Sequence, residues 1–225
     1  MNKETQEITK EEIKKEFQLE RMILFSDAVF AIVITLMAIE IHLPESHEKY
    51  NEASFLVAVK HLLPTIFGYA LSFFFIGQMW YTHLKMFSLL KDYNKGLIIR
   101  NLIFLFFIGL FPFGASLIVS GQNILSPAMI YIFILICCFA AQIVLHDFIV
   151  NKSKNIIIRT DLTSERLDLK KRTLTMITLV TCGILAYVTA MLIEDRDDKA
   201  YAFLWILVFS ITARIISVKY KASSI

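Results

Sequence analysis

Six long apolar runs dominate the sequence and leave few ways in which it can fold. They cover residues 22–43, 58–84, 97–120, 127–150, 173–193 and 201–218. A membrane-spanning helix needs roughly 20 apolar residues, and a content of 56% hydrophobic residues is too high for an ordinary soluble domain. The runs are continuous rather than alternating, which excludes a transmembrane β-barrel. The sequence therefore predicts an all-α membrane protein with six transmembrane helices in a lipid bilayer.

The distribution of basic residues predicts how these helices are oriented. Lysine and arginine number 19 on the side that holds both termini and the second and fourth loops, and 4 on the other side. The positive-inside rule therefore predicts a multi-pass protein of the cell membrane with both termini in the cytoplasm. We expect a charged helical lead-in over 1–20, a six-helix transmembrane domain over 21–218 and a short cytoplasmic tail over 219–225. The net charge of +3 reflects these anchors, so no nucleic-acid partner is expected.

Two local features predict details of the helices. Pro112 lies in the middle of the third run, where it should kink the helix and free backbone carbonyls. The longest connection, residues 151–172, predicts a short cytoplasmic helix with Thr163 or Ser164 near its N-cap. No metal motif, nucleophile elbow or phosphate loop is visible, so we expect neither an enzyme nor a bound cofactor.

A carboxylate inside the first apolar run is the main candidate for a functional site. Asp27 costs about 3 kcal/mol or more at membrane depth and survives there only with partners or water. At about 100° per residue, Asp27 points about 140° away from Ile32. Ile32, Leu36 and Ile39 share one stripe, with Thr35 on its flank. Asp27 should therefore face neighbouring helices, while the stripe faces lipid, a packed core or a central axis.

Several polar residues share the predicted membrane side of Asp27 and could hold it. Trp80 and His83 end the second run and Asn101 begins the third, both on the cytoplasmic side. A histidine close to a carboxylate is a natural partner. The sequence thus predicts a structural polar network of Arg21, Ser26, Asp27, Trp80, His83 and Asn101.

The residues of the first run also resemble a known signature. The stretch Arg21-x-x-x-Phe25-Ser26-Asp27-Ala-Val-Phe-Ala-Ile32-x-x-Thr35-Leu36 closely resembles that of the transmembrane protein 175 family of potassium-permeable channels. Two further stretches resemble the second and third helices of the family: Trp80-x-x-His83-x-x-x-Phe87 and Asn101-Leu-x-x-Leu-Phe-Phe-x-x-Leu-x-Pro112.

This resemblance implies a potassium-preferring cation channel, with residues 21–218 as its channel domain. The first helices of four identical subunits would line a central pore, because the chain resembles the prokaryotic form with one six-helix unit. Ile32 would form the constriction, Leu36 and Ile39 further apolar layers, and Thr35 a hydroxyl associated with cation preference. Arg21, Phe25 and the polar network would hold the helices in place. The permeant potassium ion is the only ion or cofactor implied.

Two other classes of function stay open at this point. A proton- or ion-coupled secondary transporter would use Asp27 as its ion site, but broken helix pairs in two related halves are absent from the sequence. A membrane enzyme or a structural partner subunit is the second alternative, with Asp27 and His83 as the only candidate reactive pair.

Overall fold

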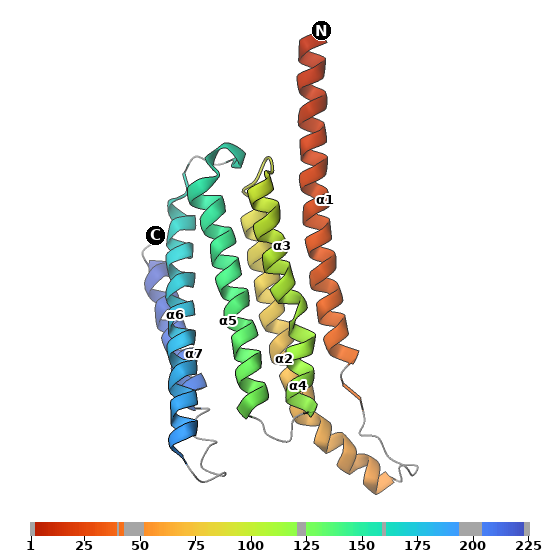
Figure 1. Ribbon diagram of the computed structural model, residues 1–225, viewed down its shortest axis with the longest axis vertical. Coiled ribbons are helices and arrows are strands. Elements are labelled where there is room, and N and C mark those ends of the chain that lie inside the picture. Colours follow the sequence, from red (N-terminus) through yellow and green to blue (C-terminus); the bar gives the residue numbers. More distant parts are fainter. Residues whose placement is uncertain are drawn as a thin grey trace.

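The computed structural model describes residues 3–39, 41–42, 52–120, 125–158, 161–193 and 204–222. In this part of the chain almost every residue is helical (Figure 1), so the all-α prediction is confirmed. The α-helices are α1 (Lys3–Ile39), α2 (Glu52–Phe87), α3 (Lys95–Gly109), α4 (Phe111–Ser120), α5 (Leu125–Asp147), α6 (Thr163–Leu192) and α7 (Leu204–Ala222). A π-helical turn (Phe148–Lys152) and a 3-10 turn (Lys154–Ile156) follow α5.

Five helical segments of the described residues are long and apolar enough to cross a membrane. They are Glu12–Ile39, Phe55–Phe87, Lys95–Leu117, Pro127–Lys152 and Thr163–Leu192. The sixth predicted run corresponds to α7, which has 19 residues and includes Arg214 and Lys219. The beginning of that run, residues 201–203, lies outside the described residues.

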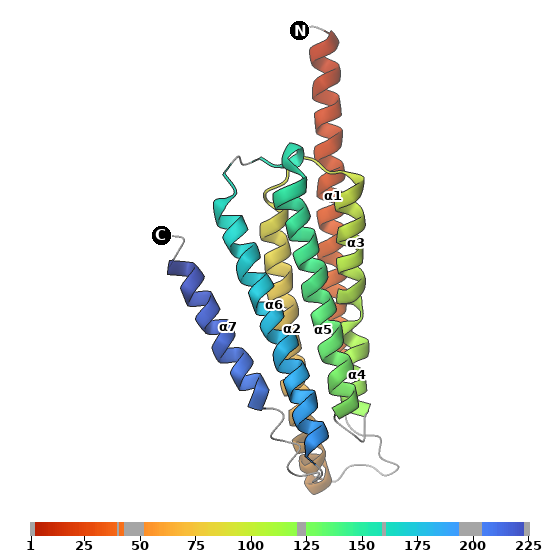
Figure 2. The ribbon, with the colours of Figure 1, turned by 60° about the vertical axis from the view of Figure 1, so that its left-hand side comes forward.

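The helices lie side by side as a slab (Figures 1 and 2). Helix α1 forms one edge and packs against α2, α3 and α4, whereas α6 and α7 pair at the other edge. Helix α5 joins the two halves through contacts with α3, α4 and α6. We call the upper end of the bundle the end that carries the α2–α3 and α5–α6 connections, which is at the top in Figure 1. The beginning of α1 and the end of α7 also lie toward this end (Figure 1).

The break predicted at Pro112 is confirmed. Helix α3 ends at Gly109 and α4 begins at Phe111, so one membrane span consists of two helices. The Leu110 N–H donates to the Phe107 carbonyl at 3.2 Å, one residue closer than an α-helical acceptor. The cause is the proline ring, which clashes with the carbonyl of the residue four positions earlier and lacks an N–H of its own.

The predicted cytoplasmic helix does not exist as a separate element. Residues 163–192 form one helix, so the charged segment and the fifth apolar run are continuous. Asp161 defines the start, because its Oδ1 accepts hydrogen bonds from the Thr163 backbone N–H at 3.0 Å and hydroxyl at 2.7 Å. No glycine or proline occurs between Thr163 and Cys182, so nothing in the sequence ends the helix where the charges stop.

A short backbone pairing closes the upper end of the bundle. Lys91 N–H donates to the Ile156 carbonyl and Ile158 N–H to the Leu89 carbonyl, each at 2.9 Å. Leu90 and Ile157 between them form an antiparallel bridge and are buried. The pairing fixes the α2–α3 connection against the α5–α6 connection, and thereby holds the upper ends of α2 and α5 in a defined relation.

Candidate functional site

Helix α1 presents an apolar face that no other part of the described chain covers. Ile32 is 56% exposed, Leu36 45% and Ile39 72%. The opposite face of the same helix is buried against the bundle, with Phe30, Val33 and Met37 in the core. We refer to Ile32, Leu36 and Ile39 as the α1 stripe. An apolar face of this kind must meet lipid or another protein surface.

Thr35 interrupts this face with one hydroxyl. Its Oγ1 donates to the carbonyls of Ala31 and Ile32, at 3.0 and 2.9 Å. The hydroxyl proton is therefore engaged in hydrogen bonds to carbonyls of the same helix. The hydroxyl oxygen remains available as a hydrogen-bond acceptor on the exposed side. An acceptor of this type, set among aliphatic side chains, favours a cation or a water proton over an anion.

Asp27 lies on the other side of α1 and contacts α2. The indole Nε1–H of Trp80 donates to Asp27 Oδ1 at 2.8 Å, and the carboxylate is half-buried. This hydrogen bond joins α1 to α2 and gives the Asp27 carboxylate the partner that a charge at membrane depth requires. The separation of Asp27 from the α1 stripe agrees with the helical angle read from the sequence.

Three buried polar residues form a second connection between α1, α2 and α3. Asn101 Nδ2 donates to Ser26 Oγ at 2.9 Å, and the ring Nε2 of His83 lies 2.8 Å from Asn101 Oδ1. Because an amide oxygen can only accept, His83 donates from Nε2. The Ser26 hydroxyl donates a hydrogen bond to the Met22 carbonyl at 2.9 Å. We call Ser26, His83 and Asn101 the Asn101 network; all three are at least 99% buried.

Aromatic side chains hold the His83 ring in place. Phe87 stacks on it with ring centroids 4.0 Å apart, and Phe104 lies nearly parallel at 5.9 Å. Phe30 from α1 is tilted against the same ring at 5.8 Å. The imidazole is thus a packed part of the core that makes its hydrogen bond inside the bundle. The ring is 1% exposed, so almost none of its surface reaches the outside of the bundle.

The structure does not join Arg21 or Phe25 to these contacts. Arg21 is exposed and makes no hydrogen bond or ion pair within the described part of the chain. Phe25 is 53% exposed. Both residues lie within about 20° of Ile32 around the helix, so they continue the α1 stripe toward the upper end. Their predicted place in the network is therefore not formed within one chain.

Sequence reasoning missed a charged cluster at the upper end of the bundle. Lys85 Nζ on α2 contacts Asp168 Oδ2 at 2.8 Å and Glu165 Oε1 at 3.9 Å on α6. Glu165 Oε2 in turn lies 3.4 Å from Nε2 of His146 on α5, and both of these residues are buried. The cluster joins three helices two residues beyond His83. The spacing of Glu165 and Asp168, which places both on one helix face, was its only signal in the sequence.

The described residues contain no group of three or more His, Cys, Asp or Glu side chains that could hold a metal ion. Cys137, Cys138 and Cys182 are free thiols on α5 and α6. The site consists of an exposed apolar stripe on one side of α1 and of hydrogen bonds on the other side that fix the orientation of α1.

The Trp80–Asp27 contact gives a first prediction. Trp80→Phe keeps the ring packing but removes the Nε1–H donor, so the free energy of unfolding should fall by about 1 kcal/mol. Thermal unfolding of the detergent-purified protein measures this. Tyr81→Phe, which changes an exposed neighbour on α2, is the control. An unchanged melting temperature for Trp80→Phe would show that the hydrogen bond does not stabilise the fold.

Part of the chain is similar to a known family of proteins. Residues 21–112 match the model of the family described as endosomal/lysosomal potassium channel TMEM175. The matched region runs from Arg21 within α1 to Pro112, just past the α3–α4 break, and so includes the α1 stripe, the Trp80–Asp27 contact and the Asn101 network.

Named relatives come from bacteria and animals. A potassium channel of Chryseobacterium sp. (strain P1-3) is 30% identical over 130 residues, which is 58% of this chain and 64% of the relative. The human endosomal/lysosomal proton channel TMEM175 is 30% identical over 127 residues, 56% of this chain and 24% of the human protein. The chain thus spans less than two thirds of the length of these relatives.

A solved structure shares the fold. The crystal structure of a lysosomal potassium-selective channel TMEM175 homolog from Chamaesiphon minutus superposes with a TM-score of 0.69 and 20% sequence identity. The match covers 90% of this chain and 98% of the other. The likeness therefore includes helices beyond the region recognised by the family model.

Proposed function

We propose that this chain is a member of the TMEM175 family, whose model its residues 21–112 match, and that it is a potassium-preferring cation channel. Its pore would be lined by the first helices of four copies, with Ile32 at the narrowest level. The observation that carries the proposal is the difference between the two sides of α1. Buried hydrogen bonds fix one side of the helix, and the other side is a stripe of aliphatic residues that the single chain leaves uncovered.

The stripe supports a pore that works without a carbonyl-lined filter. Side chains such as Ile32 and Leu36 provide no ligand for a dehydrated ion, so they restrict passage by width and by dewetting. Thr35, with an oxygen acceptor at the flank of the stripe, would favour cations at this level. Ile32 lies within the continuous helix α1, where backbone carbonyls accept helical hydrogen bonds, and this supports selection by side chains rather than by backbone at that level.

Assembly follows from the geometry of one helix. A single α1 cannot enclose a pore, so several copies must surround a closed symmetry axis. The resemblance to single-unit prokaryotic members supports four copies. In such a tetramer the four stripes would face the axis and be shielded from lipid, while each Asn101 network stays inside its own subunit. We further propose that both termini are cytoplasmic and that the protein resides in the cell membrane, as its basic residues predict.

Electrical recording tests the function directly. Purified protein in a planar bilayer, with potassium on one side and sodium on the other, should give unitary currents and a reversal potential displaced toward the potassium equilibrium value. Repeating the measurement under a proton gradient identifies any proton current. An absence of unitary currents in a correctly assembled protein would overturn the channel proposal.

The position of Leu36 allows a separate test of assembly. Leu36→Cys places a thiol on the stripe, where copies from neighbouring subunits should form disulfides when oxidised. Val188→Cys on α6, also 45% exposed, should give none because it lies at the opposite edge of the slab. Intact-complex mass should be four times 25.9 kDa. A monomeric or dimeric protein without crosslinks at Leu36 would contradict the tetrameric pore.

A conservative change at Asp27 distinguishes a channel from a coupled transporter. Asp27→Asn keeps an oxygen acceptor for Trp80 but removes the charge, so a channel in which Asp27 is structural should retain most of its current. A transporter that loads a proton or ion on Asp27 would lose transport altogether. Loss of flux with an intact assembly would therefore favour the transporter.

A further inference from the structure

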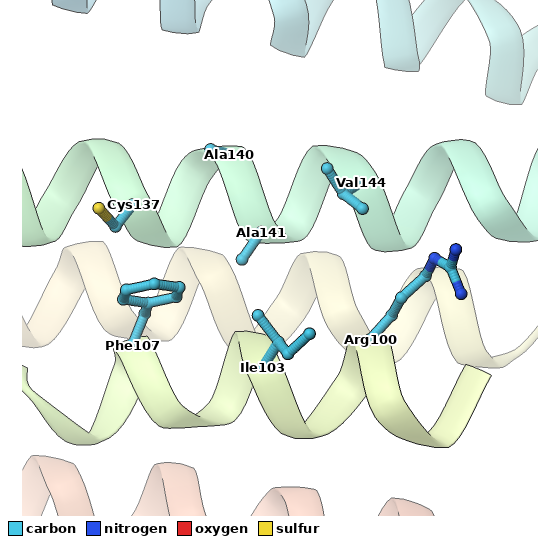
Figure 3. A pocket seen from close by; sticks show the side chains of 7 residues that line it. All are labelled: Arg100, Ile103, Phe107, Cys137, Ala140, Ala141 and Val144. Atoms are coloured by element: carbon cyan, nitrogen blue, oxygen red, sulfur yellow. The ribbon is translucent and has the colours of Figure 1, made fainter. Parts of the chain in front are cut away.

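A narrow groove lies between α3 and α5, away from the α1 stripe. Six apolar or small side chains and one arginine line a volume of about 200 Å³: Arg100, Ile103, Phe107, Cys137, Ala140, Ala141 and Val144. Figure 3 shows them along the seam between the two helices, with Arg100 at one end and the apolar groups behind it. The small residues on α5 leave the space that larger side chains would fill.

Arg100 stands at the end of the groove that is nearer to the upper end of the bundle. It follows the first residue of α3 by five positions, which places it about 8 Å along the helix axis. Its guanidinium lies 4.0 Å from the centre of the Phe148 ring, and its Nη1 donates to the Gly96 carbonyl at 3.0 Å. The stem of the side chain is half-buried, so the charged group is held near the membrane boundary rather than extended into water.

Close packing fixes the arginine in this position. A Cβ added at Gly96 would lie 2.6 Å from Phe148 Cζ and 3.2 Å from Arg100 Nη1. Only glycine allows both groups to approach α3 at this point. The Phe148 ring belongs to the turn that follows α5, so the arrangement joins the two helices that form the groove.

The charge of Arg100 has no acidic partner in the part of the chain that the structure describes. Among the described residues no carboxylate forms an ion pair with it; the nearby Asp147 pairs with Lys152 at 3.7 Å and accepts from Asn151. A guanidinium has five N–H donors, of which one is used by the Gly96 carbonyl. A half-buried cation with free donors, next to an apolar groove, is complementary to an anionic headgroup that carries an acyl chain.

We propose that this groove is a binding site for an anionic phospholipid, with its phosphate on the guanidinium of Arg100 and one acyl chain along Ile103, Ala140 and Val144. Basic pockets between transmembrane helices are known to recognise anionic headgroups on the cytoplasmic side. The basic-residue count predicts that the upper end faces the cytoplasm. The proposal does not depend on ion conduction, because it concerns the groove between α3 and α5 rather than the α1 stripe.

Native mass spectrometry of the full-length protein tests the site, with phosphatidylglycerol and phosphatidylcholine offered in equal amounts. The wild type should retain phosphatidylglycerol preferentially. Arg100→Gln should lower that preference about tenfold, since a charge-assisted phosphate contact is lost. Ala140→Phe, which fills the groove but keeps the charge, should reduce occupancy by both lipids. Arg166→Gln removes an exposed arginine from α6 and should leave binding unchanged.

Other results would overturn the proposal. Equal retention of the two lipids by the wild type would show ordinary lipid contact without a headgroup site. Unchanged preference in both Arg100→Gln and Ala140→Phe would place any anionic lipid elsewhere. If these variants instead alter the oligomeric mass without altering lipid retention, a second copy of the chain covers the groove. Arg100→Lys keeps the charge and should keep part of the preference, which separates loss of binding from loss of folding.

Discussion

Replacing Ile32 with asparagine should raise the unitary conductance and weaken discrimination between potassium and sodium. The side chain is exposed on the α1 stripe and, in the proposed tetramer, four copies meet at one level. A polar amide keeps water at that level, so the cost of passing an apolar constriction is reduced. If the barrier falls by about 1 kcal/mol, the conductance rises about fivefold. Planar-bilayer recording measures both the conductance and the reversal potential.

The matched control for this variant is Ile177→Asn. Ile177 is 50% exposed and lies on α6, at the edge of the slab away from α1, so the same polar group there should not affect permeation. Unchanged conductance and reversal potential in Ile32→Asn, with normal assembly, would show that the constriction is formed by other residues.

Replacing Asn101 with alanine should destabilise the protein more than any single change in the exposed part of the site. The substitution leaves the Nε2–H of His83 without an acceptor in a fully buried position and creates a small cavity. We expect a loss of about 2 kcal/mol, although single hydrogen bonds between membrane helices contribute less than this on average. Thermal unfolding in detergent should show a melting temperature lower by roughly 4–8 °C.

A paired change separates the hydrogen bond from the packing. His83→Phe combined with Asn101→Leu removes both polar partners and keeps aromatic contacts with Phe87 and Phe104, so it should lose less stability than Asn101→Ala alone. Asn155→Ala in the exposed α5–α6 connection serves as the neutral control. A melting temperature of Asn101→Ala equal to that of the wild type would mean that the network does not stabilise the bundle.

The helical period was enough to predict that Asp27 and Ile32 lie on different sides of α1, because the angle between them around the helix axis follows from their separation in sequence. The same rule explains where the family resemblance was not sufficient. Arg21 and Phe25 lie eleven and seven residues before Ile32, so they share its face and cannot reach a network inside the same subunit. In the proposed tetramer they face neighbouring first helices instead.

Other features required contacts between distant segments. The sequence contained Glu165 and His146, but the pairing at 3.4 Å depends on how α5 and α6 are joined, which no local pattern specifies. The same is true of the groove beside Arg100, since its walls come from helices about 40 residues apart. The break at Leu110 could be predicted because its cause is local: the ring of Pro112 acts on its own helix.

The continuity of α1 has a mechanical consequence. The helix runs without interruption from Lys3 to Ile39, so a charged segment and the proposed constriction belong to one rod. Glu12 is about 30 Å from Ile32 along that rod, and no turn lies between them to absorb a rotation. The Lys15–Asp92 ion pair at 3.9 Å attaches the rod to the α2–α3 connection. A rotation of the charged segment is therefore transmitted along α1 toward Ile32, and the buried contacts of Ser26 and Phe30 resist it before it reaches that level.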